Sequence, residues 1–404
     1  MQRHRCLLRL RSHKWRLCGA LATVIAAAGV LAQGGPGLAQ ETSVEATESP
    51  ASTRRYWTAE RFRNARPAPM PTASYRTGGR PSFVPQAGKS VRSRGAPPKV
   101  KVGDALEIEL YEPDEDPASA EEGDAYLTPQ NHTLKPLASA LAGAVFSHSR
   151  VFPQQAVKTY PYRAIGKLFF RDPVAGGDFV CSGAVIQRRI VLTAGHCVYE
   201  PVGGYFFDRF VFVPAFDRGR APFGRWEVRW KITTQPWAEG GGMLPNAADF
   251  AILQVIDQRI AVKTSAERQV TRRRRPRKRA IGDIVGWLGW LTNALLNNHV
   301  ALLGYPVALD RGERMQVTHA ETFREAFPNA AEFGSYLSAG ASGGPIVQDL
   351  GKRAIGQPAG ANWVVGVVSY EFVNDWIVGS SILNGDFIEI FDRACARNRR
   401  NCAR

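Results

Sequence analysis

Two short segments of the chain carry residue types suited to nucleophilic chemistry. One ends the apolar run 190–194 with His196 beside Cys197, and the other places Ser342 inside a glycine turn. A serine hydroxyl is a weak nucleophile until a base takes its proton, and a histidine within hydrogen-bond reach is the usual base. The two segments therefore predict a serine nucleophile activated by a histidine.

The glycines around this serine predict a site for developing negative charge. Gly340, Gly343 and Gly344 flank Ser342 and permit backbone conformations that are closed to other residues. The N–H groups of Gly340 and Ser342 would then point to one spot and form an oxyanion hole. Each donor in such a hole is typically worth about 3 kcal/mol in the transition state.

A carboxylate is needed to orient the imidazole and to stabilise its charged form. The aspartates between the two segments are Asp208, Asp217, Asp249, Asp257, Asp283 and Asp310. We favour Asp249, because it stands just before the alternating run 250–256 and its backbone would be held rigidly. Asp257 follows the same run and is expected in a surface turn. His299 and His319 lack a motif and are expected to be structural or exposed.

The elements that position these residues are predicted to be short β-strands. Apolar or alternating runs, separated by Gly, Pro and Asp, cover residues 164–170, 179–186, 190–193, 209–213, 226–232, 250–256, 299–303, 363–369 and 376–382. Regular short strands with turn signals between them are typical of all-β barrels or sandwiches. Residues 160–404 would suit two small barrels, with the apolar stretch 284–296 in the core or at a barrel edge.

The first 39 residues are predicted to be a secretory signal. A basic start precedes the apolar run 19–32, and residues 37–39 form a small-x-small cleavage site. The run is short for a membrane span, so an uncleaved anchor is the weaker alternative. We expect a secreted or periplasmic protein without a stable membrane span once the signal is removed.

Residues 40–150 are predicted to be a largely disordered propeptide or linker. Pro, Ser, Thr, Ala and Arg dominate up to residue 101, and residues 104–124 hold ten acids and no base. Low apolar density with blocks of charge favours disorder. The segment is either a solvated tail or a propeptide that covers the basic domain 151–404 until it is removed.

Four cysteines are left after the signal, and they allow three pairings. Export implies an oxidising compartment, and neighbours in sequence suggest Cys181–Cys197 and Cys395–Cys402. The first bridge would close a loop worth roughly 3 kcal/mol on the chain-entropy model. A metal site is the weaker alternative, because the cysteines lack a C-x-x-C motif or clustered histidines, and we expect no metal and no cofactor.

The net charge of +16 is unevenly distributed, and its densest block is Arg272–Arg279, with seven bases in eight positions. We expect a solvated connector there. The alternatives are a site of proteolytic nicking or a patch for an anionic partner. No aromatic residues interleave with the basic ones, so specific nucleic-acid binding is not expected.

The order His196, Asp249, Ser342 resembles that of the trypsin-like (chymotrypsin-fold) serine peptidases. Residues 181–184 and 194–197 match the segments that form this family's disulfide around the histidine, and residues 281–287 and 304–306 are similar to the bacterial branch of glutamyl endopeptidases. The resemblance covers about residues 160–392. It implies two six-stranded antiparallel β-barrels with the active site between them, and a monomeric serine endopeptidase that acts on proteins or peptides through an acyl-enzyme.

Two departures from the family pattern concern activation and specificity. Animal members carry an aspartate where this chain has Ala341, so activation by an ion pair with a new N-terminus is not expected. Cleavage after Arg150, which leaves Val151 first, is an alternative hypothesis. Tyr336, Leu337 and Val368 stand where the family places its charged or polar specificity residues, so they predict a pocket for an apolar side chain.

The segment Ser369-Tyr370-Glu371 corresponds to the one that pairs with the substrate backbone as an added strand. We assign Ser369 and Glu371 to the specificity region, where Glu371 would narrow the cleft or meet a basic substrate residue; a solvent-facing edge residue is the alternative. The rival interpretation of the whole chain is a catalytically silent peptidase-like protein that acts in binding or adhesion. An esterase on another fold is disfavoured by the order of the triad residues.

Overall fold

The computed structural model describes residues 42–73, 88–100, 107–112, 144–240, 242, 244, 248–260, 277–295, 299–326, 329–351, 362–372 and 376–403. The chain divides into two compact units, Met1–Ala39 and Gln40–Arg404, and all described residues belong to the second. The predicted signal sequence and its cleavage site lie outside the described residues. Within the described ranges, no helix combines the length and the hydropathy required to cross a bilayer.

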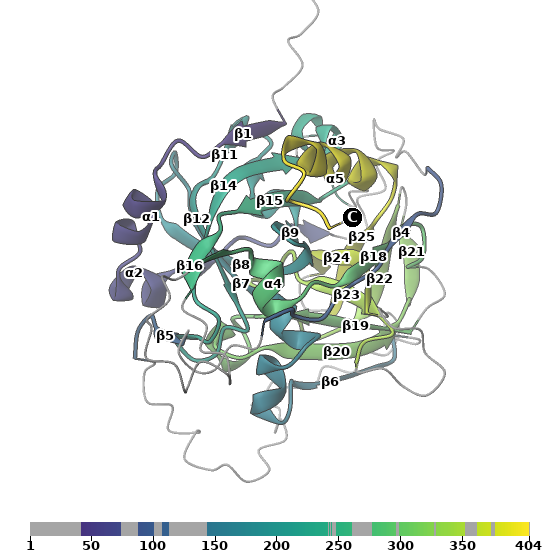
Figure 1. Ribbon diagram of the computed structural model, residues 1–404. Coiled ribbons are helices and arrows are strands. Elements are labelled where there is room, and N and C mark those ends of the chain that lie inside the picture. Colours follow the sequence, from purple (N-terminus) through teal and green to yellow (C-terminus); the bar gives the residue numbers. More distant parts are fainter. Residues whose placement is uncertain are drawn as a thin grey trace, which may run out of the picture. The chain divides into compact units, whose positions relative to one another are not determined.

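Six antiparallel strands close into the first barrel. They are β7 (Ile165–Arg171), β8 (Asp178–Gln187), β9 (Ile190–Thr193), β12 (Asp208–Pro214), β14 (Trp226–Thr233) and β15 (Ala251–Val255). Each pairs with the next around the ring, and the pairing of β14 with β15 closes it (Figure 1). The interior is strongly aromatic, since Phe169, Phe212 and Trp226 are fully buried. Burial of such large side chains is the main stabilising contribution to a core of this kind.

The second sheet is an open half-barrel. Its central strands run in the order β22 (Ala330–Gly334), β25 (Ile377–Ile382), β24 (Trp363–Phe372), β23 (Pro345–Gln348), β19 (His299–Gly304) and β20 (Gln316–Glu321). The ends are extended by β21 (Arg324–Ala326) and β6 (Phe146–Arg150), and β18 (Gly289–Leu291) pairs with β24. The predicted all-β, two-barrel architecture is confirmed. Among the described strands, however, no pairing closes the second sheet as β14–β15 closes the first.

Two short helices and one longer helix border these sheets. They are α3 (Gln235–Glu239), α4 (Ile281–Val285) and α5 (Gly385–Arg397). The side-chain oxygen of Asn384 caps α5 by accepting from the N–H groups of residues 386 and 387, and Phe387 and Phe391 pack against Trp290. The described part of the stretch predicted as core, residues 284–295, is formed by α4, β18 and buried tryptophans.

The described parts of residues 40–150 form short helices and strands that the sequence did not predict. They contain α1 (Pro50–Tyr56), α2 (Ala59–Asn64), β1 (Ser43–Glu45), β2 (Arg66–Pro67), β3 (Thr72–Ala73), β4 (Arg92–Ser93) and β5 (Ile108–Glu109). The five strands pair with β14, β8, β24, β18 and β13 (Arg220–Ala221), respectively. Trp57 and Phe62 are 2% exposed and join the aromatic core at Phe169. Burial of these two aromatic side chains and pairing with strands of the two sheets thus order a region whose composition is poor in apolar residues.

The basic run Arg272–Arg279 is described only at its end. Residues 272–276 lie outside the described residues, and β17 (Arg277–Arg279) pairs with β16 (Gln258–Ile260). Arg277 and Lys278 are exposed. The predicted solvent exposure therefore holds for these two side chains, and their backbone pairs with β16.

His148 on β6 is expected to make folding stability sensitive to acid. Burial lowers the pKa of His148 from the ordinary 6.5 to about 4. Between these values the unfolded chain binds a proton that the folded chain does not, so this stability is present above pH 6.5 and is lost as the pH falls toward 4. The free energy of unfolding should fall by roughly 2 kcal/mol more from pH 7 to 4.5 in the native chain than in His148→Gln. Equal losses in chemical denaturation would contradict this.

Candidate active site

The turn that follows β9 presents His196 to the space between the sheets. Residues Gly195–Cys197 form one turn of 3-10 helix, and Cys197 is joined to Cys181 on β8 by a disulfide. Only glycine fits at position 195, because a Cβ atom there would lie 2.8 Å from Trp237 and 2.9 Å from the Asp249 carboxylate. The second disulfide, Cys395–Cys402, joins the end of α5 to the C-terminal tail.

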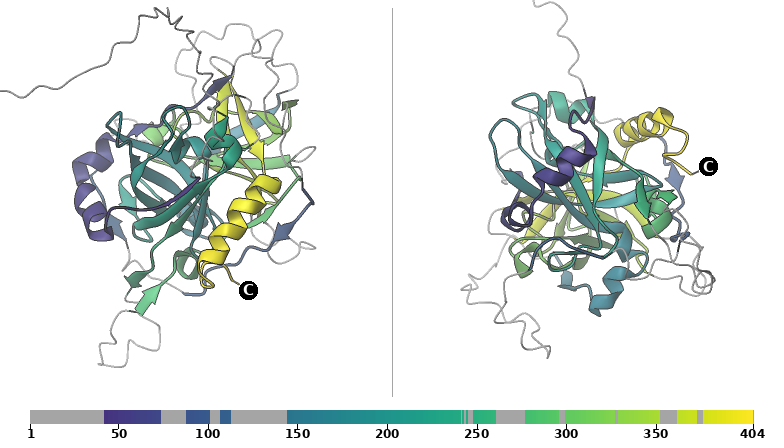
Figure 2. Two further views of the ribbon diagram at one scale, coloured as in Figure 1. Left: turned by 90° about the horizontal axis from the view of Figure 1, so that it is seen from above. Right: turned by 60° about the vertical axis from the view of Figure 1, so that its left-hand side comes forward.

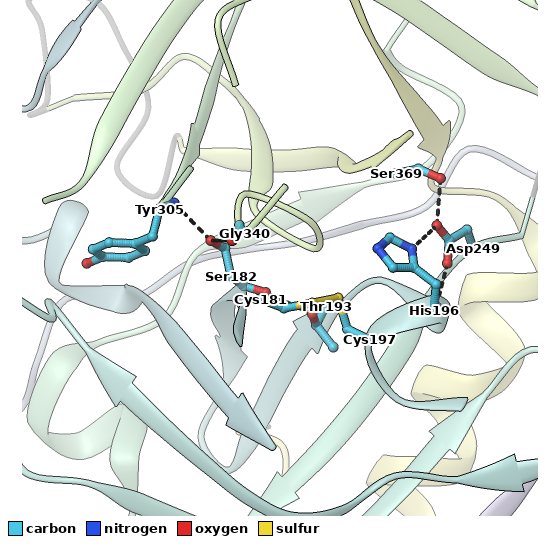
Figure 3. Close-up of a disulfide and its surroundings, with 9 residues drawn as sticks. All are labelled: Cys181, Ser182, Thr193, His196, Cys197, Asp249, Tyr305, Gly340 and Ser369. Atoms are coloured by element: carbon cyan, nitrogen blue, oxygen red, sulfur yellow. Dashed lines mark hydrogen bonds and ion pairs between the residues drawn. A yellow bond between two sulfur atoms is a disulfide. The ribbon is translucent and has the colours of Figure 1, made fainter. Parts of the chain in front are cut away.

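Asp249 is fully buried and accepts three hydrogen bonds (Figure 3). Its Oδ1 accepts from the His196 backbone N–H at 2.8 Å, and its Oδ2 lies 2.8 Å from His196 Nδ1. The Ser369 hydroxyl donates to the same Oδ2 at 2.6 Å. A buried carboxylate needs such donors to offset its desolvation. Because it can only accept, we assign the proton to Nδ1, which leaves Nε2 as a proton acceptor.

The serine turn packs directly against the end of the histidine strand. Gly343 has φ = +75°, and a Cβ atom there would lie 2.0 Å from Thr193 Oγ1 and 2.6 Å from the Ala194 nitrogen. Thr193 is the last residue of β9, three positions before His196. The glycine therefore serves both the left-handed backbone and the close approach that brings Ser342 and His196 to one site.

Ser182 couples the serine turn to the first barrel. Its N–H donates to the Ser342 carbonyl at 2.7 Å, and its hydroxyl donates to the Gly340 carbonyl at 2.9 Å. The same hydroxyl accepts from the Tyr305 N–H at 3.0 Å (Figure 3). Ser182 is next to Cys181 and fully buried. This role of Ser182 could not be predicted from the sequence, because its partners Tyr305 and Gly340 lie 123 and 158 positions away in the chain.

Replacing Ser182 with alanine should loosen the serine turn. The change leaves the Tyr305 N–H and the Gly340 carbonyl buried without this partner, which costs about 1–3 kcal/mol per unsatisfied group. We expect a lower free energy of unfolding together with lower kcat, measured by denaturant titration and steady-state kinetics. Val174→Ala, at a side chain that is 70% exposed, is the control and should change neither quantity. Unchanged stability in Ser182→Ala would contradict this coupling.

The reactive atoms of His196 and Ser342 are both buried. His196 Nε2 and Ser342 Oγ have no hydrogen-bond partner among the described residues, so the bond between them is not formed. Such catalytic bonds are often long in enzymes without substrate and tighten when substrate binds. The geometry thus provides an oriented base and a serine hydroxyl in the turn that packs on the same strand end, both of them buried.

The predicted oxyanion donors are free within the described part of the chain. The amide N–H groups of Gly340 and Ser342 donate to no described acceptor, whereas the next amide, that of Gly343, donates to the Val368 carbonyl at 2.8 Å. Gly340 has φ = +98°, so its peptide is held in the left-handed region. Two neighbouring unpaired N–H groups at a rigid turn suit the binding of an oxyanion.

The predicted specificity residues divide into two groups. Leu337 is 3% exposed and Val368 is fully buried, and both belong to one apolar cluster. Tyr336 is half-buried, with its ring edge-on to the rings of Phe146 and Trp376.

Ser369 and Glu371 occupy different places. The Ser369 hydroxyl donates to Asp249 and so supports the carboxylate, while its assignment to the specificity region stays a prediction. Glu371 lies near the end of β24, between β25 and β3, where burial raises the pKa of its carboxyl group.

Cys181, Cys197 and His196 place their potential ligand atoms within 4.8 Å of one another. A thiolate is the form of cysteine that binds a metal ion, and both sulfurs here are consumed by the disulfide. This cluster does not fit a metal ion while the disulfide is intact.

Two antiparallel β-sheets, with a histidine turn from one packed against a serine turn from the other, define a trypsin-like serine peptidase fold. A comparison with protein families agrees: the trypsin family model matches residues 155–376, so this chain belongs to the trypsin family.

Among individual relatives, the glutamyl endopeptidase of Bacillus licheniformis is 22% identical over 196 residues, which are 48% of this chain and 51% of that protein. An extracellular metalloprotease of Bacillus subtilis is 27% identical over 81 residues, 20% of this chain and 26% of the relative. The chain thus spans about half, or less, of the length of these curated relatives. The resemblance to the glutamyl endopeptidase branch is confirmed by the first of them.

Solved structures with similar folds include the protease Anisep from Arthrobacter nicotinovorans, at 24% identity and a TM-score of 0.46, covering 58% of this chain and 96% of that one. A Glu endopeptidase in complex with MPD has 20% identity and a TM-score of 0.43, covering 62% and 96%, respectively.

Proposed function

We propose that this protein is a secreted serine endopeptidase. The observation that carries the proposal is the buried Asp249, which orients His196 through two hydrogen bonds at 2.8 Å while the serine turn packs on the same strand end. This arrangement is the one in which a histidine activates a serine for attack on a carbonyl.

In the proposed reaction, Ser342 Oγ attacks the carbonyl carbon of the scissile peptide while His196 Nε2 takes its proton. The N–H groups of Gly340 and Ser342 bind the resulting oxyanion, and Asp249 stabilises the imidazolium. His196 then gives the proton to the leaving amine, which departs and leaves an acyl-enzyme. A water molecule, deprotonated by the same histidine, repeats the sequence and releases the acid.

The test is hydrolysis of a protein substrate by the secreted enzyme, purified after its proposed N-terminal processing. Inactivation by a serine-directed fluorophosphonate and resistance to chelators are expected. A folded, processed enzyme that binds peptides without ever cleaving them would contradict the proposal and would favour the silent binding protein instead.

We expect the enzyme to prefer an apolar side chain at the cleaved bond. Leu337 and Val368 offer apolar surface, and Tyr336 offers no counter-charge for a basic side chain. His148 packs against the Tyr336 ring, but with a pKa of about 4 it is neutral at pH 7 and provides no cation for a glutamate. A peptide-library profile measured at pH 7 checks this preference; one dominated by Glu or Arg would overturn it.

The proposed maturation removes a signal at residues 1–39 and a propeptide at residues 40–150, leaving the peptidase domain 151–404 outside the cytoplasm, either secreted or periplasmic. The predicted cut after Arg150 falls at the end of β6, where the Arg150 guanidinium pairs with Asp310 and the Val151 N–H donates to the Met315 carbonyl at 3.0 Å. N-terminal sequencing of the secreted form tests this boundary. The monomeric state and the anionic partner of Arg272–Arg279 stay predictions.

A further inference from the structure

One segment of the N-terminal region crosses from the first sheet to the second at the active site. Residues 66–73 follow α2, pair first with β8 and then with β24. In the left view of Figure 2, the purple chain leaves the α1–α2 region and runs toward the middle of the molecule. Both pairings are parallel and only two residues long. The segment is therefore an addition to strands β8 and β24, which belong to sheets formed by other parts of the chain.

The two anchoring hydrogen bonds flank the triad. On the first sheet, the Ala68 N–H donates to the Val180 carbonyl at 3.0 Å, and Val180 immediately precedes the Cys181–Cys197 bridge beside His196. On the second sheet, the Glu371 N–H donates to the Pro71 carbonyl at 3.0 Å, two positions after the Ser369 that binds Asp249. The chain between Ala68 and Pro71 spans at most about 10 Å. It therefore has to pass directly between these two points.

Met70 lies between the anchors and is buried. It is 5% exposed and belongs to the same apolar cluster as Leu337, Ala341 and Val368. Ala341 directly precedes the proposed nucleophile, and the other two are the apolar side chains of the predicted specificity pocket. A buried methionine from the N-terminal region is thus part of the apolar cluster that contains the predicted pocket residues.

The reactive groups are covered. Ser342 is 0% exposed, and both its Oγ and His196 Nε2 are buried without a hydrogen-bond partner among the described residues. Two buried polar atoms without hydrogen-bond partners lower the stability of the folded chain. We expect such atoms where a segment without suitable polar groups covers a functional site.

The composition of the segment suits it to hold an extended shape. Prolines stand at alternate positions, 67, 69 and 71, and each fixes its own φ while the following proline restricts Ala68 and Met70 to extended conformations. Little conformational entropy is then lost when the segment binds. The binding mode is strand addition, in which main-chain bonds give affinity and a side-chain pocket gives selection.

We infer that residues 66–73 are a built-in inhibitor that occupies the substrate cleft. In this arrangement Met70 fills the specificity pocket, and the Pro71 carbonyl accepts the hydrogen bond of the Glu371 N–H on β24. The inference rests on the proposed function. It assigns the regulation of that site to a short segment of the chain, and it implies that the pocket accepts an unbranched apolar side chain. Activity requires the displacement of this segment from both anchors.

The test compares the rates at which a small fluorophosphonate labels Ser342 in full-length variants. Met70→Asp places a charge in the apolar cluster and should release the segment, raising the labelling rate about tenfold or more. The matched control is Val91→Asp, because Val91 belongs to the same N-terminal region but is 40% exposed and bonds through its backbone to Thr292 instead of Val180 or Glu371. Its labelling rate should equal that of the native chain.

A second variant protects the test against a folding defect in Met70→Asp. Ala68→Pro removes the N–H that donates to Val180 without adding a charge, and it should produce the same increase in rate. Hydrogen exchange of residues 66–73 reports release of the segment directly, and thermal unfolding reports the integrity of the barrels.

Three outcomes are distinguishable. Faster labelling in both released variants supports the inference. Equal labelling of Ser342 in the native chain and in the released variants overturns the inference but leaves the peptidase function intact. Absence of labelling in folded variants whose segment is shown to be released overturns the proposed function itself.

Discussion

Replacing Asp249 with asparagine lowers kcat by about ten-thousandfold, with the fold retained. In the native chain, three donors converge on this carboxylate: the His196 N–H, the His196 ring and the Ser369 hydroxyl. An asparagine offers one acceptor oxygen and an NH₂ group that only donates. The imidazole then has to place its proton on Nε2, which is the atom that must accept the proton of Ser342.

The chain supplies a matched control at the other end of the same strand. Asp249 precedes β15 and Asp257 follows it, and Asp257 pairs with Arg189 at 2.6 Å, away from His196. Asp257→Asn removes an equal charge from the chain and should leave kcat within about twofold, because the Arg189–Asp257 pair lies at the far end of β15 from His196. The measurement is the steady-state kcat of both variants, each prepared in the form of the enzyme from which residues 66–73 have been displaced. A similar loss in the two would contradict the assigned role of Asp249.

Ser342→Ala is expected to abolish catalysis and to spare stability. The loss in kcat should reach about a millionfold, as in other serine peptidases in which the nucleophile is removed. The free energy of unfolding should stay constant or rise by about 1 kcal/mol, since the deleted hydroxyl is buried without a described partner. Steady-state kinetics measures kcat, and denaturant titration measures the free energy of unfolding.

The control for this substitution is Ser338→Ala. Ser338 lies in the same turn, and its hydroxyl also has no described partner, but it carries no assigned chemical role. Its variant should retain activity within a fewfold range. If Ser338→Ala lost as much activity as Ser342→Ala, the nucleophile would be wrongly assigned.

The strands around the triad could be predicted from the sequence because their patterns are local. All nine runs expected to be strands form strands in the structure, and residues 190–193 coincide with β9. Three of the six central strands of the second sheet, β20, β22 and β23, were missed. Their sequences, QVTHAE, AAEFG and PIVQ, are short or carry buried polar residues, so neither a long apolar run nor strict alternation marks them.

The contacts around the candidate site were predictable only in part. His196, Ser342 and Asp249 stand in recognisable segments, but the hydrogen bonds of Ser182 and Ser369 join residues more than 100 positions apart. Short-range patterns carry no information about such contacts. The same holds for Met70, since its burial depends on two sheet edges that form elsewhere in the chain. From the sequence alone, the alternating prolines predict only an extended segment, because the pairing with β8 and β24 is not encoded locally.

The most direct test of the account is the identity of the serine that reacts. The Met70→Asp chain, shown to be folded by thermal unfolding, is incubated with a fluorophosphonate, digested and mapped by mass spectrometry. The account predicts one adduct per chain, on Ser342, and none after Ser342→Ala. A folded, segment-released chain that stays unmodified, or that carries its adduct on another serine, would contradict the account.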